Sequence, residues 1–254
     1  MTPDQLLEEA AATPFVGWDF RAYADRIDQS EPPWSFGRLV DEAAASATAM
    51  LDLGTGGGEW LSGRRHAPLT VATESWAPNV PVAAARLAEL GIPVVHAEDP
   101  VDTLPQELGA PPGRLPFRDA TFDLVVDRHE AFAATEVARV LRPGGVFLTQ
   151  QADSGAATVR TLLGIPAQAG PAFTLDLAAG QVERAGLQVL EAATADVTTR
   201  FADIGAFAWC LSHVPWVVPG FTIAAHREAL LRLAGSPITV PAARFWLRAR
   251  RPEN

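Results

Sequence analysis

A short apolar segment that runs into a cluster of glycines constrains the fold of this chain more than any other stretch. Residues 49–53 have the composition of a buried strand, and four of the five residues that follow are glycines. Glycine tolerates positive φ and, having no Cβ, lets a ligand approach the backbone closely. In open α/β sheets such turns lie at the carboxyl ends of parallel strands, where these folds bind their ligands. The segment therefore predicts an α/β fold with a ligand site at the glycine turn.

Strand-like and helix-like segments alternate along much of the chain, and this alternation predicts a largely parallel sheet. We expect strands at 49–53, 70–73, 93–95, 122–126, 145–150, 187–197 and 243–249. We expect helices at 3–12, 36–47, 57–64, 79–90, 132–141 and 177–185, and two more within 201–235. The helix at 57–64 would begin directly after the glycine turn and present its free N–H groups there.

No repeat and no long linker divides the chain, so we expect one domain over residues 1–254. An aromatic-rich N-terminal segment (about 1–47) is predicted to cap the rim of this domain. A segment at about 199–240 is predicted to form a helical cover. The Pro- and Gly-rich stretch 105–114 has the composition of a loop.

Charge and composition exclude several classes of partner. The chain has a formal net charge of −10 and is 48% hydrophobic, which favours a well-buried core and disfavours nucleic acid as a partner. The densest basic run places Arg244, Arg248 and Arg250 on one face of the expected last strand, with apolar residues on the other. This alternation predicts that the three arginines face solvent.

Cysteine usage and hydropathy lead to further expectations. Cys210 is the only cysteine, so no intrachain disulfide can form. The first residues lack the pattern of a signal peptide, and no apolar run reaches the roughly 18 residues of a membrane span. We therefore expect a cytoplasmic protein with no membrane partner. The histidines have no metal-ligand spacing, so we expect no metal.

The glycine spacing bears on which cofactor the turn binds. A dinucleotide fingerprint needs a third glycine five residues after the first, and here that position is Glu59. A carboxylate at this place would repel a pyrophosphate, so an NAD-dependent oxidoreductase is disfavoured. The spacing suits a ligand without phosphates.

The segment from Asp52 to Gly58 resembles motif I of the class I S-adenosylmethionine (SAM)-dependent methyltransferases, of the methyltransferase type 11 kind. Three further stretches agree with that family in order and position: Glu74 at the end of the second strand, the lead into the fourth strand at 115–125, and the helix and turn at 136–145. The resemblance covers about residues 48–150. It implies a Rossmann-like sheet, mostly parallel with a final antiparallel strand, and helices on both faces.

The resemblance also implies roles in binding SAM. Asp52 would meet the methionyl amino group, Glu74 would accept hydrogen bonds from the ribose hydroxyls, and Trp76 would lie along the adenine. The methionyl part would pass over Gly54, Thr55, Gly56 and Gly58, and Glu98 or Asp99 would accept from the adenine amino group. Each has a structural alternative: Asp52 as a turn cap, Glu74 as a solvated strand end, Trp76 as core.

Methyl transfer from a sulfonium mainly requires alignment of the acceptor, and a base only where the attacking atom carries a proton. In this family the end of the fourth strand faces the methyl group, and here it delivers Arg128 and His129. His129 is the candidate base, with orientation of the loop as the alternative. Arg128 would hold an anionic group of the acceptor, or pair with Asp127 or Glu130.

The acceptor side is indicated by polar and aromatic residues outside motif I. Gln150, His213 and Trp216 are predicted to line the acceptor site, with solvent exposure or plain packing as alternatives. The family's Asn/Asp-Pro-Pro-Tyr type of motif is absent, so a small organic acceptor is favoured over a nucleic acid or protein amide. The alternative function is a SAM-binding protein of this fold without methyl transfer. The sequence leaves a monomer and a homodimer equally open.

Overall fold

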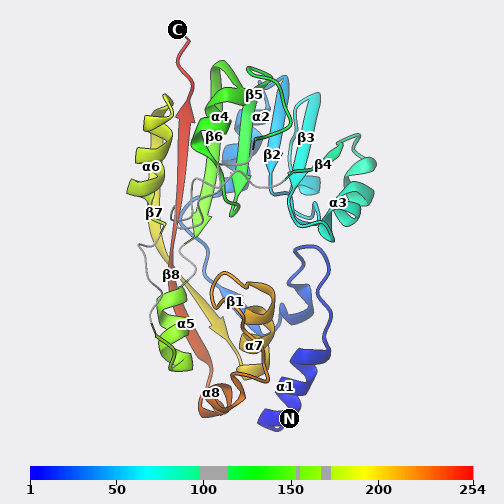
Figure 1. The fold of residues 1–254 in the computed structure, drawn as a ribbon, viewed down its shortest axis with the longest axis vertical. Coiled ribbons are helices and arrows are strands. Elements are labelled where there is room, and N and C mark those ends of the chain that lie inside the picture. Colours follow the sequence, from blue (N-terminus) through cyan, green and yellow to red (C-terminus); the bar gives the residue numbers. More distant parts are fainter. Residues whose placement is uncertain (98–113, 153–154, 167–172, 254) are drawn as a thin grey trace.

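The centre of the molecule is one sheet, seen in the computed structural model, which describes residues 1–97, 114–152, 155–166 and 173–253. Within these residues the strand order is β1-β7-β8-β6-β5-β2-β3-β4 (Figure 1). The strands are β1 (Ile27–Gln29), β2 (Ala49–Leu53), β3 (Leu69–Glu74), β4 (Val94–His96), β5 (Phe122–Arg128), β6 (Leu141–Ala152), β7 (Gln188–Phe201) and β8 (Ile238–Arg250).

Strand directions follow the predicted fold class. The strands β4, β3, β2, β5 and β6 run parallel to one another, whereas β8 runs antiparallel to both β6 and β7. The mostly parallel sheet with a final antiparallel strand is therefore confirmed. The parallel register brings Leu53 opposite Asp127 and Arg128 opposite Gln150, so these strand ends meet at one edge.

Helices cover both faces of the sheet, as predicted. On one face α2 (Phe36–Ala44) and α3 (Asn79–Ala88) bury Val40 and Leu87 against β2 and β5. On the other, α4 (Ala134–Val140) and α6 (Leu175–Arg184) bury Val137 and Val182 in a second core. Because both faces are covered, β2 is buried along its whole length.

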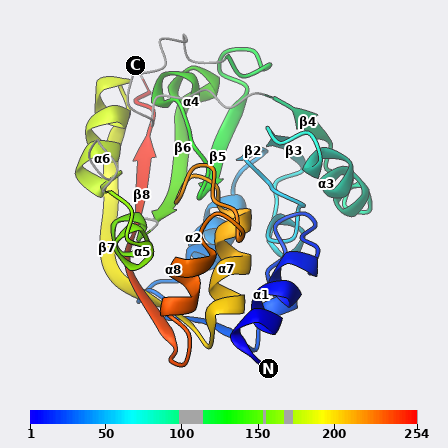
Figure 2. The ribbon, with the colours of Figure 1, turned by 60° about the horizontal axis from the view of Figure 1, so that its bottom comes forward.

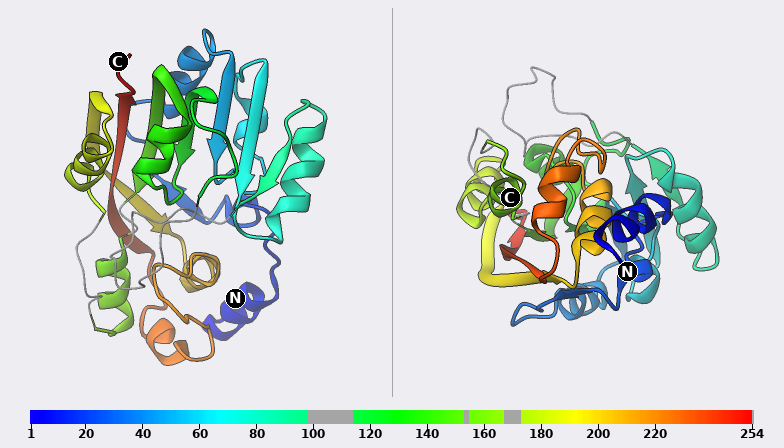
Figure 3. Two further views of the ribbon diagram at one scale, coloured as in Figure 1. Left: turned by 45° about the horizontal axis from the view of Figure 1, so that its top comes forward. Right: turned by 90° about the horizontal axis from the view of Figure 1, so that it is seen from below.

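A separate group of helices lies beyond the carboxyl ends of the parallel strands. It consists of α1 (Pro3–Ala12), α5 (Ala156–Leu163), α7 (Ile204–His213) and α8 (Arg227–Arg232) (Figures 1 and 2). The end of β7 and the start of β8 extend into this group, where Phe201, Ile238 and Val240 join its apolar core. Seen from below, α1, α7 and α8 come in front of the sheet (Figure 3).

Local signals explain where these helices begin. Thr2 and Gln5 form a capping box at the start of α1. Asp203 accepts hydrogen bonds from the backbone N–H groups of Gly205 and Ala206 at the start of α7. Asp203 also pairs with Arg26 at 2.7 Å, and Arg26 pairs with Glu9 at 2.6 Å. This ion-pair group joins α1 to α7.

The structure corrects two expectations and adds two elements. The helix expected at 57–64 is wrong: this stretch holds only a 3₁₀ turn at Leu61–Gly63. Gly58 has φ of +78°, which is incompatible with the first turn of a helix. The strand β1 and the helix α5 were not anticipated. The stretch 105–114 lies, but for its last residue, outside the described residues.

The second correction concerns the arginines of β8. Arg250 is exposed as expected, but Arg244 and Arg248 are half-buried on either side of the buried Trp246. Trp246, which lies between them, packs into the apolar cluster around α2, so this part of the face is partly covered. None of the described helices has the length and hydropathy required to cross a membrane.

Candidate donor and acceptor site

The glycine turn after β2 is fastened to β3 by its backbone. The Thr55 N–H donates to the Thr73 carbonyl at 2.9 Å. Gly54, Gly56 and Gly58 have φ values of +63°, +62° and +78°, a region that a residue with a Cβ adopts only with strain. The turn therefore requires glycine at these three positions, and it lies at the carboxyl edge of the sheet.

Glu74, the last residue of β3, lies directly beside this turn. Its side chain is buried, and its Oε2 accepts a hydrogen bond from the Gly56 N–H at 2.7 Å. Its Oε1 accepts from the Trp76 N–H at 2.9 Å. The solvated strand end that was the alternative for Glu74 is not what the structure contains. Trp76 is 53% exposed, so its ring is not core and is accessible to a ligand.

Asp52 is a second buried carboxyl group at the same edge. Only 3% of the residue is exposed, and burial raises the pKa of its carboxyl to about 7. A carboxyl group in this state ionises when a cation binds beside it, because the opposite charge favours the ionised form. The residue is therefore suited to an ammonium group. Glu98 and Asp99 lie outside the described residues.

Two side chains rest on the glycine turn. A Cβ on Gly54 would lie 2.3 Å from Cγ of Glu130, and a Cβ on Gly56 would lie 3.0 Å from Cβ of Trp18. The Glu130 N–H donates to Oδ1 of the buried Asp127 at 3.0 Å. The sequence placed Trp18 in the N-terminal aromatic cap and Glu130 as a possible partner of Arg128, and it did not assign either side chain to the glycine turn.

Asp127, near the end of β5, connects this strand to β6 through hydrogen bonds. It is fully buried, and burial raises the pKa of its carboxyl well above the ordinary value. Its Oδ2 accepts from Oγ1 of Thr149 at 3.1 Å and from Nε2 of Gln151 at 2.9 Å. This network joins β5 to β6 where the chain turns toward Arg128 and His129.

His129 follows β5 with φ of +67° and engages both neighbouring strands. Its Nε2 lies 3.0 Å from Nη1 of Arg244 and 3.1 Å from Nε2 of Gln150. A guanidinium can only donate, so Nε2 is the acceptor and Nδ1 carries the proton. Nδ1 is buried, with no hydrogen-bond partner among the described residues. Burial, followed by the charges of Arg244 and Arg128, holds the pKa of His129 well below its ordinary value.

Arg128 lies next to this histidine at the end of β5. Its guanidinium stands 5.4 Å from the centre of the Trp60 ring, a cation–π contact. Burial lowers its pKa, with the charge of Arg244 as the second cause. Among the described residues Arg128 forms no ion pair, so the alternative pairing with Asp127 or Glu130 does not occur.

The remaining candidates divide into two groups. Gln150 belongs with His129, and its Oε1 accepts a hydrogen bond from Nε1 of Trp34 at 2.9 Å. His213 instead stacks on Phe15 with ring centres 4.5 Å apart, and its Nδ1 lies 2.7 Å from the Trp209 carbonyl.

Trp216 belongs to the second group, and its ring stacks on Trp18 at 5.6 Å. The segment predicted as a helical cover thus contacts the N-terminal aromatic segment through Trp18, the side chain that also lies against Gly56.

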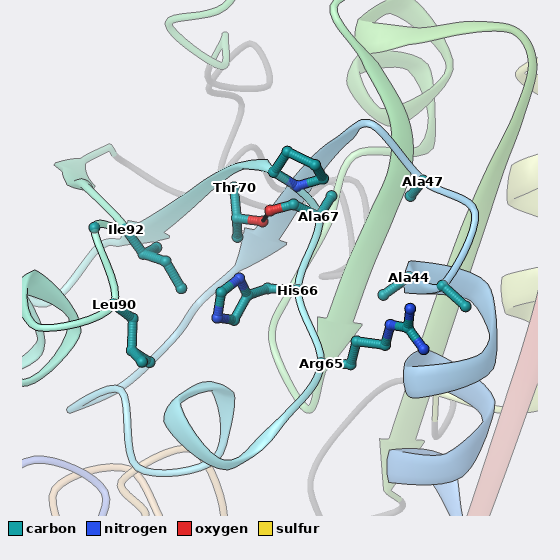
Figure 4. Close-up of a pocket in the computed structure, with 11 residues that line it drawn as sticks. Ala44, Ala47, Arg65, His66, Ala67, Thr70, Leu90 and Ile92 are labelled. Atoms are coloured by element: carbon teal, nitrogen blue, oxygen red, sulfur yellow. Dashed lines mark hydrogen bonds between the residues drawn. The ribbon is translucent and has the colours of Figure 1, made fainter.

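A surface pocket among the described residues lies away from the glycine turn. It has a volume of about 380 Å³ and is lined by Arg65, His66, Leu90 and Ile92 among others (Figure 4). Its lining includes Ala47 and Thr70, near the amino ends of β2 and β3, at the opposite edge of the sheet from the glycine turn. Over the described residues, no group of three or more His, Cys, Asp or Glu side chains is arranged to hold a metal ion.

Comparison with known proteins defines the class. Residues 51–149 match the family model described as a methyltransferase domain. No curated protein matches the chain. Among solved structures, a candidate methyltransferase from Bacillus halodurans superposes with a TM-score of 0.59 at 18% identity, over 85% of this chain and 98% of that one.

Two further structures have the same fold. The YcgJ protein of Bacillus subtilis gives a TM-score of 0.55 at 16% identity, over 86% of this chain and 99% of that one. The cyclase SpnF gives 0.52 at 18% identity, over 99% and 93%. Residues 51–149 therefore form a methyltransferase domain, and the chain has the class I methyltransferase fold. The family matched over these residues uses SAM as its cofactor.

The residues at the carboxyl edge fit this cofactor chemically. SAM carries an ammonium group, a ribose with two hydroxyls and no phosphate. The structure has a glycine turn in which an added Cβ would collide with Glu130 and Trp18, a buried carboxyl group whose pKa is raised to about 7, and a second buried carboxylate beside the turn.

Proposed function

We propose that this methyltransferase acts on a small organic acceptor, and that the glycine turn, Asp52 and Glu74 hold its methyl donor. The observation that carries the donor assignment is the 2.7 Å hydrogen bond between Glu74 and the Gly56 N–H, which places a buried carboxylate at the turn. Glu74 would accept the ribose hydroxyls, and Asp52 would face the methionyl ammonium. Trp76, exposed beside them, would lie along the adenine.

The acceptor would lie over the ends of β5 and β6, with Arg128, His129 and Gln150 around it. The sulfonium of the donor already activates the methyl group, so the protein's task is to align the acceptor and to exclude water. Phe15, Trp18, His213 and Trp216 provide an apolar cover on the side of the glycine turn.

We propose that His129 positions Arg244 instead of removing a proton from the acceptor. The lone pair of Nε2 is already directed at a guanidinium donor, and the lowered pKa makes the imidazole a weak base. With Nε2 engaged by Arg244 and Nδ1 protonated, the imidazole has no free lone pair with which to take a proton from the acceptor.

Binding and turnover test this proposal separately. Isothermal titration should show binding of SAM and of its demethylated product, S-adenosylhomocysteine. Incubation of the protein with methyl-labelled SAM and a broad set of small metabolites should then transfer label to a small molecule and release S-adenosylhomocysteine. Binding without any transfer across the set would favour the alternative, a protein of this fold that binds SAM for another purpose. Absence of binding would refute the donor assignment.

A further inference from the structure

Two arginines near the expected acceptor lack a counter-ion. Arg128 and Arg244 are half-buried, and no carboxylate of the described residues lies within ion-pair distance of either. Two other shielded arginines have carboxylate partners, Arg26 with Asp203 at 2.7 Å and Arg139 with Glu136 at 2.6 Å, and Arg251 donates to the backbone carbonyls of Ala138 and Leu141. Unpaired cations that are partly removed from water are costly, so a pair of them calls for a ligand.

Neutral groups hold these arginines in place without cancelling their charge. Arg244 directs Nη1 to His129 Nε2 at 3.0 Å and Nη2 to Gln29 Oε1 at 2.6 Å, and its Nε is buried without a partner. Arg128 lies over the Trp60 ring. Glu31 and Asp52 act on Arg128 only at longer range, after its burial and the charge of Arg244. The positive charge therefore remains available, on side chains of fixed orientation.

The two arginines lie on the acceptor side of the sheet edge. Arg128 ends β5 opposite Gln150, and Arg244 lies opposite Ala152 at the end of β6. The glycine turn follows β2, which separates β5 from β3 and Glu74. A donor that extends from Glu74 across the turn would thus have its sugar on the β3 side of β2, and the strands that carry the two arginines, β5 and β8, lie on the other side.

We propose that Arg128 and Arg244 together bind a carboxylate of the methyl acceptor, so that the acceptor is a small organic anion. A guanidinium offers paired donors in a plane that match the two oxygens of a carboxylate. In a chain with a net charge of −10, a local cationic pair is the feature that retains an anion. This inference rests on the proposed function, because it assigns the arginines to the acceptor of that reaction.

Matched acid and amide probes test the inference on the full chain. Benzoate and benzamide, and hexanoate and hexanamide, are titrated in the presence of S-adenosylhomocysteine and observed by ligand NMR. We expect each carboxylate to bind about tenfold tighter than its amide, the scale of a charge-assisted contact. Arg128→Gln and Arg244→Gln should each abolish this preference. Arg250→Gln, an exposed arginine on the same strand, should leave it unchanged.

The S-adenosylhomocysteine affinity separates the possible carboxylate sources. We expect both Gln variants to bind it as the unmodified chain does, which also shows that they are folded. Loss of this affinity in variants with native circular dichroism would assign the arginines to the methionyl carboxylate of the donor and overturn the acceptor assignment. Equal binding of acids and amides by the unmodified chain would overturn it as well.

Two further outcomes keep the test decisive. If Arg244→Gln fails to fold, Arg244→Lys retains the charge but not the planar fork, and we expect it to reduce the preference at least about threefold. An unchanged preference in that variant overturns the inference. If the unmodified chain binds no S-adenosylhomocysteine, the proposed function fails, while the comparison of acids with amides can still be made without it.

Discussion

At the scale of single residues, the donor side of the site depends on two buried carboxyl groups whose environments differ. Glu74 accepts two backbone hydrogen bonds, from the Gly56 and Trp76 N–H groups. The pKa of Asp52 is raised to about 7 by burial. Glu74 therefore leads to a prediction about SAM affinity, and Asp52 leads to one about how that affinity depends on pH.

Replacement of Glu74 by alanine should weaken SAM binding by roughly 1.5–3 kcal/mol, the scale of lost hydrogen bonds to a charged group. Isothermal titration measures the loss. Glu89→Ala, at an exposed position after α3, is the matched control and should bind SAM normally. An unchanged affinity in the Glu74 variant would refute its role at the ribose.

Asp52 should make SAM binding depend on pH. The carboxyl is protonated in the free protein below a pKa of about 7, and binding of an ammonium requires its ionised form. Affinity should therefore rise about tenfold between about pH 5.5 and pH 7, a range in which an α-amino group remains protonated. Titrations of Asp52→Asn should show no such rise. The same pH dependence in that variant would show that another group titrates.

At the scale of elements, the glycine turn joins three strands into one site. Its backbone bonds to β3, its Gly56 N–H reaches Glu74, and Glu130 from the end of β5 rests on Gly54. The missing helix after the turn does not weaken this arrangement, because the contacts come from the turn itself and from the neighbouring strand ends.

A Cβ at Gly54 should damage the site as well as the backbone. Gly54→Ala forces a clash with Glu130 Cγ at 2.3 Å in addition to positive φ, so we expect at least about a tenfold loss of SAM affinity. The free energy of unfolding should fall by about 1–3 kcal/mol. Gly91→Ala is the control: Gly91 has φ of +69° with nothing near its Cβ position, so it should lose stability without losing affinity. Equal SAM affinity in both variants would contradict the close packing at Gly54.

At the scale of the whole molecule, β7 and β8 connect the sheet to the helical group beyond its carboxyl edge. Both strands contribute to the cores of the sheet at one end and to the apolar core of α1, α5, α7 and α8 at the other. Continuous strands of this kind couple the two parts, so we expect the chain to unfold in one transition.

Trp209 tests this coupling. It is fully buried in the helical group, contacts Phe15, Phe20 and Tyr23, and donates through Nε1 to the Thr13 carbonyl. Trp209→Ala should lower the free energy of unfolding by about 3–5 kcal/mol. Trp216→Ala, at a residue that is 54% exposed, should cost less than about 1 kcal/mol. Denaturant unfolding followed by far-ultraviolet circular dichroism gives both values, and two separate transitions would disprove the coupling.

The sequence alone determined the features that depend on local order along the chain. The alternation of apolar segments predicted the central strands β2 and β5, because these strands are buried on both faces of the sheet. The run from Asp52 to Gly58 predicted the turn, because only glycine adopts the required φ values without strain. The resemblance to the methyltransferase family indicated Glu74 as part of the same site, and the parallel pairing of β2 with β3 brings the ends of both strands to one edge.

The tertiary structure decided which residues from different elements contact one another. The alternating pattern of β8 predicted solvent for Arg244, but the covered face of the sheet turns it toward His129, and no pattern within one strand reports what packs on it from elsewhere. The same contact is why we propose a positioning role for His129 instead of the expected base, since a guanidinium from a distant strand lies at its Nε2. The contact between Trp18 and Gly56 likewise depends on packing between distant parts of the chain. These contacts join residues far apart in sequence, and only the packed molecule brings them together.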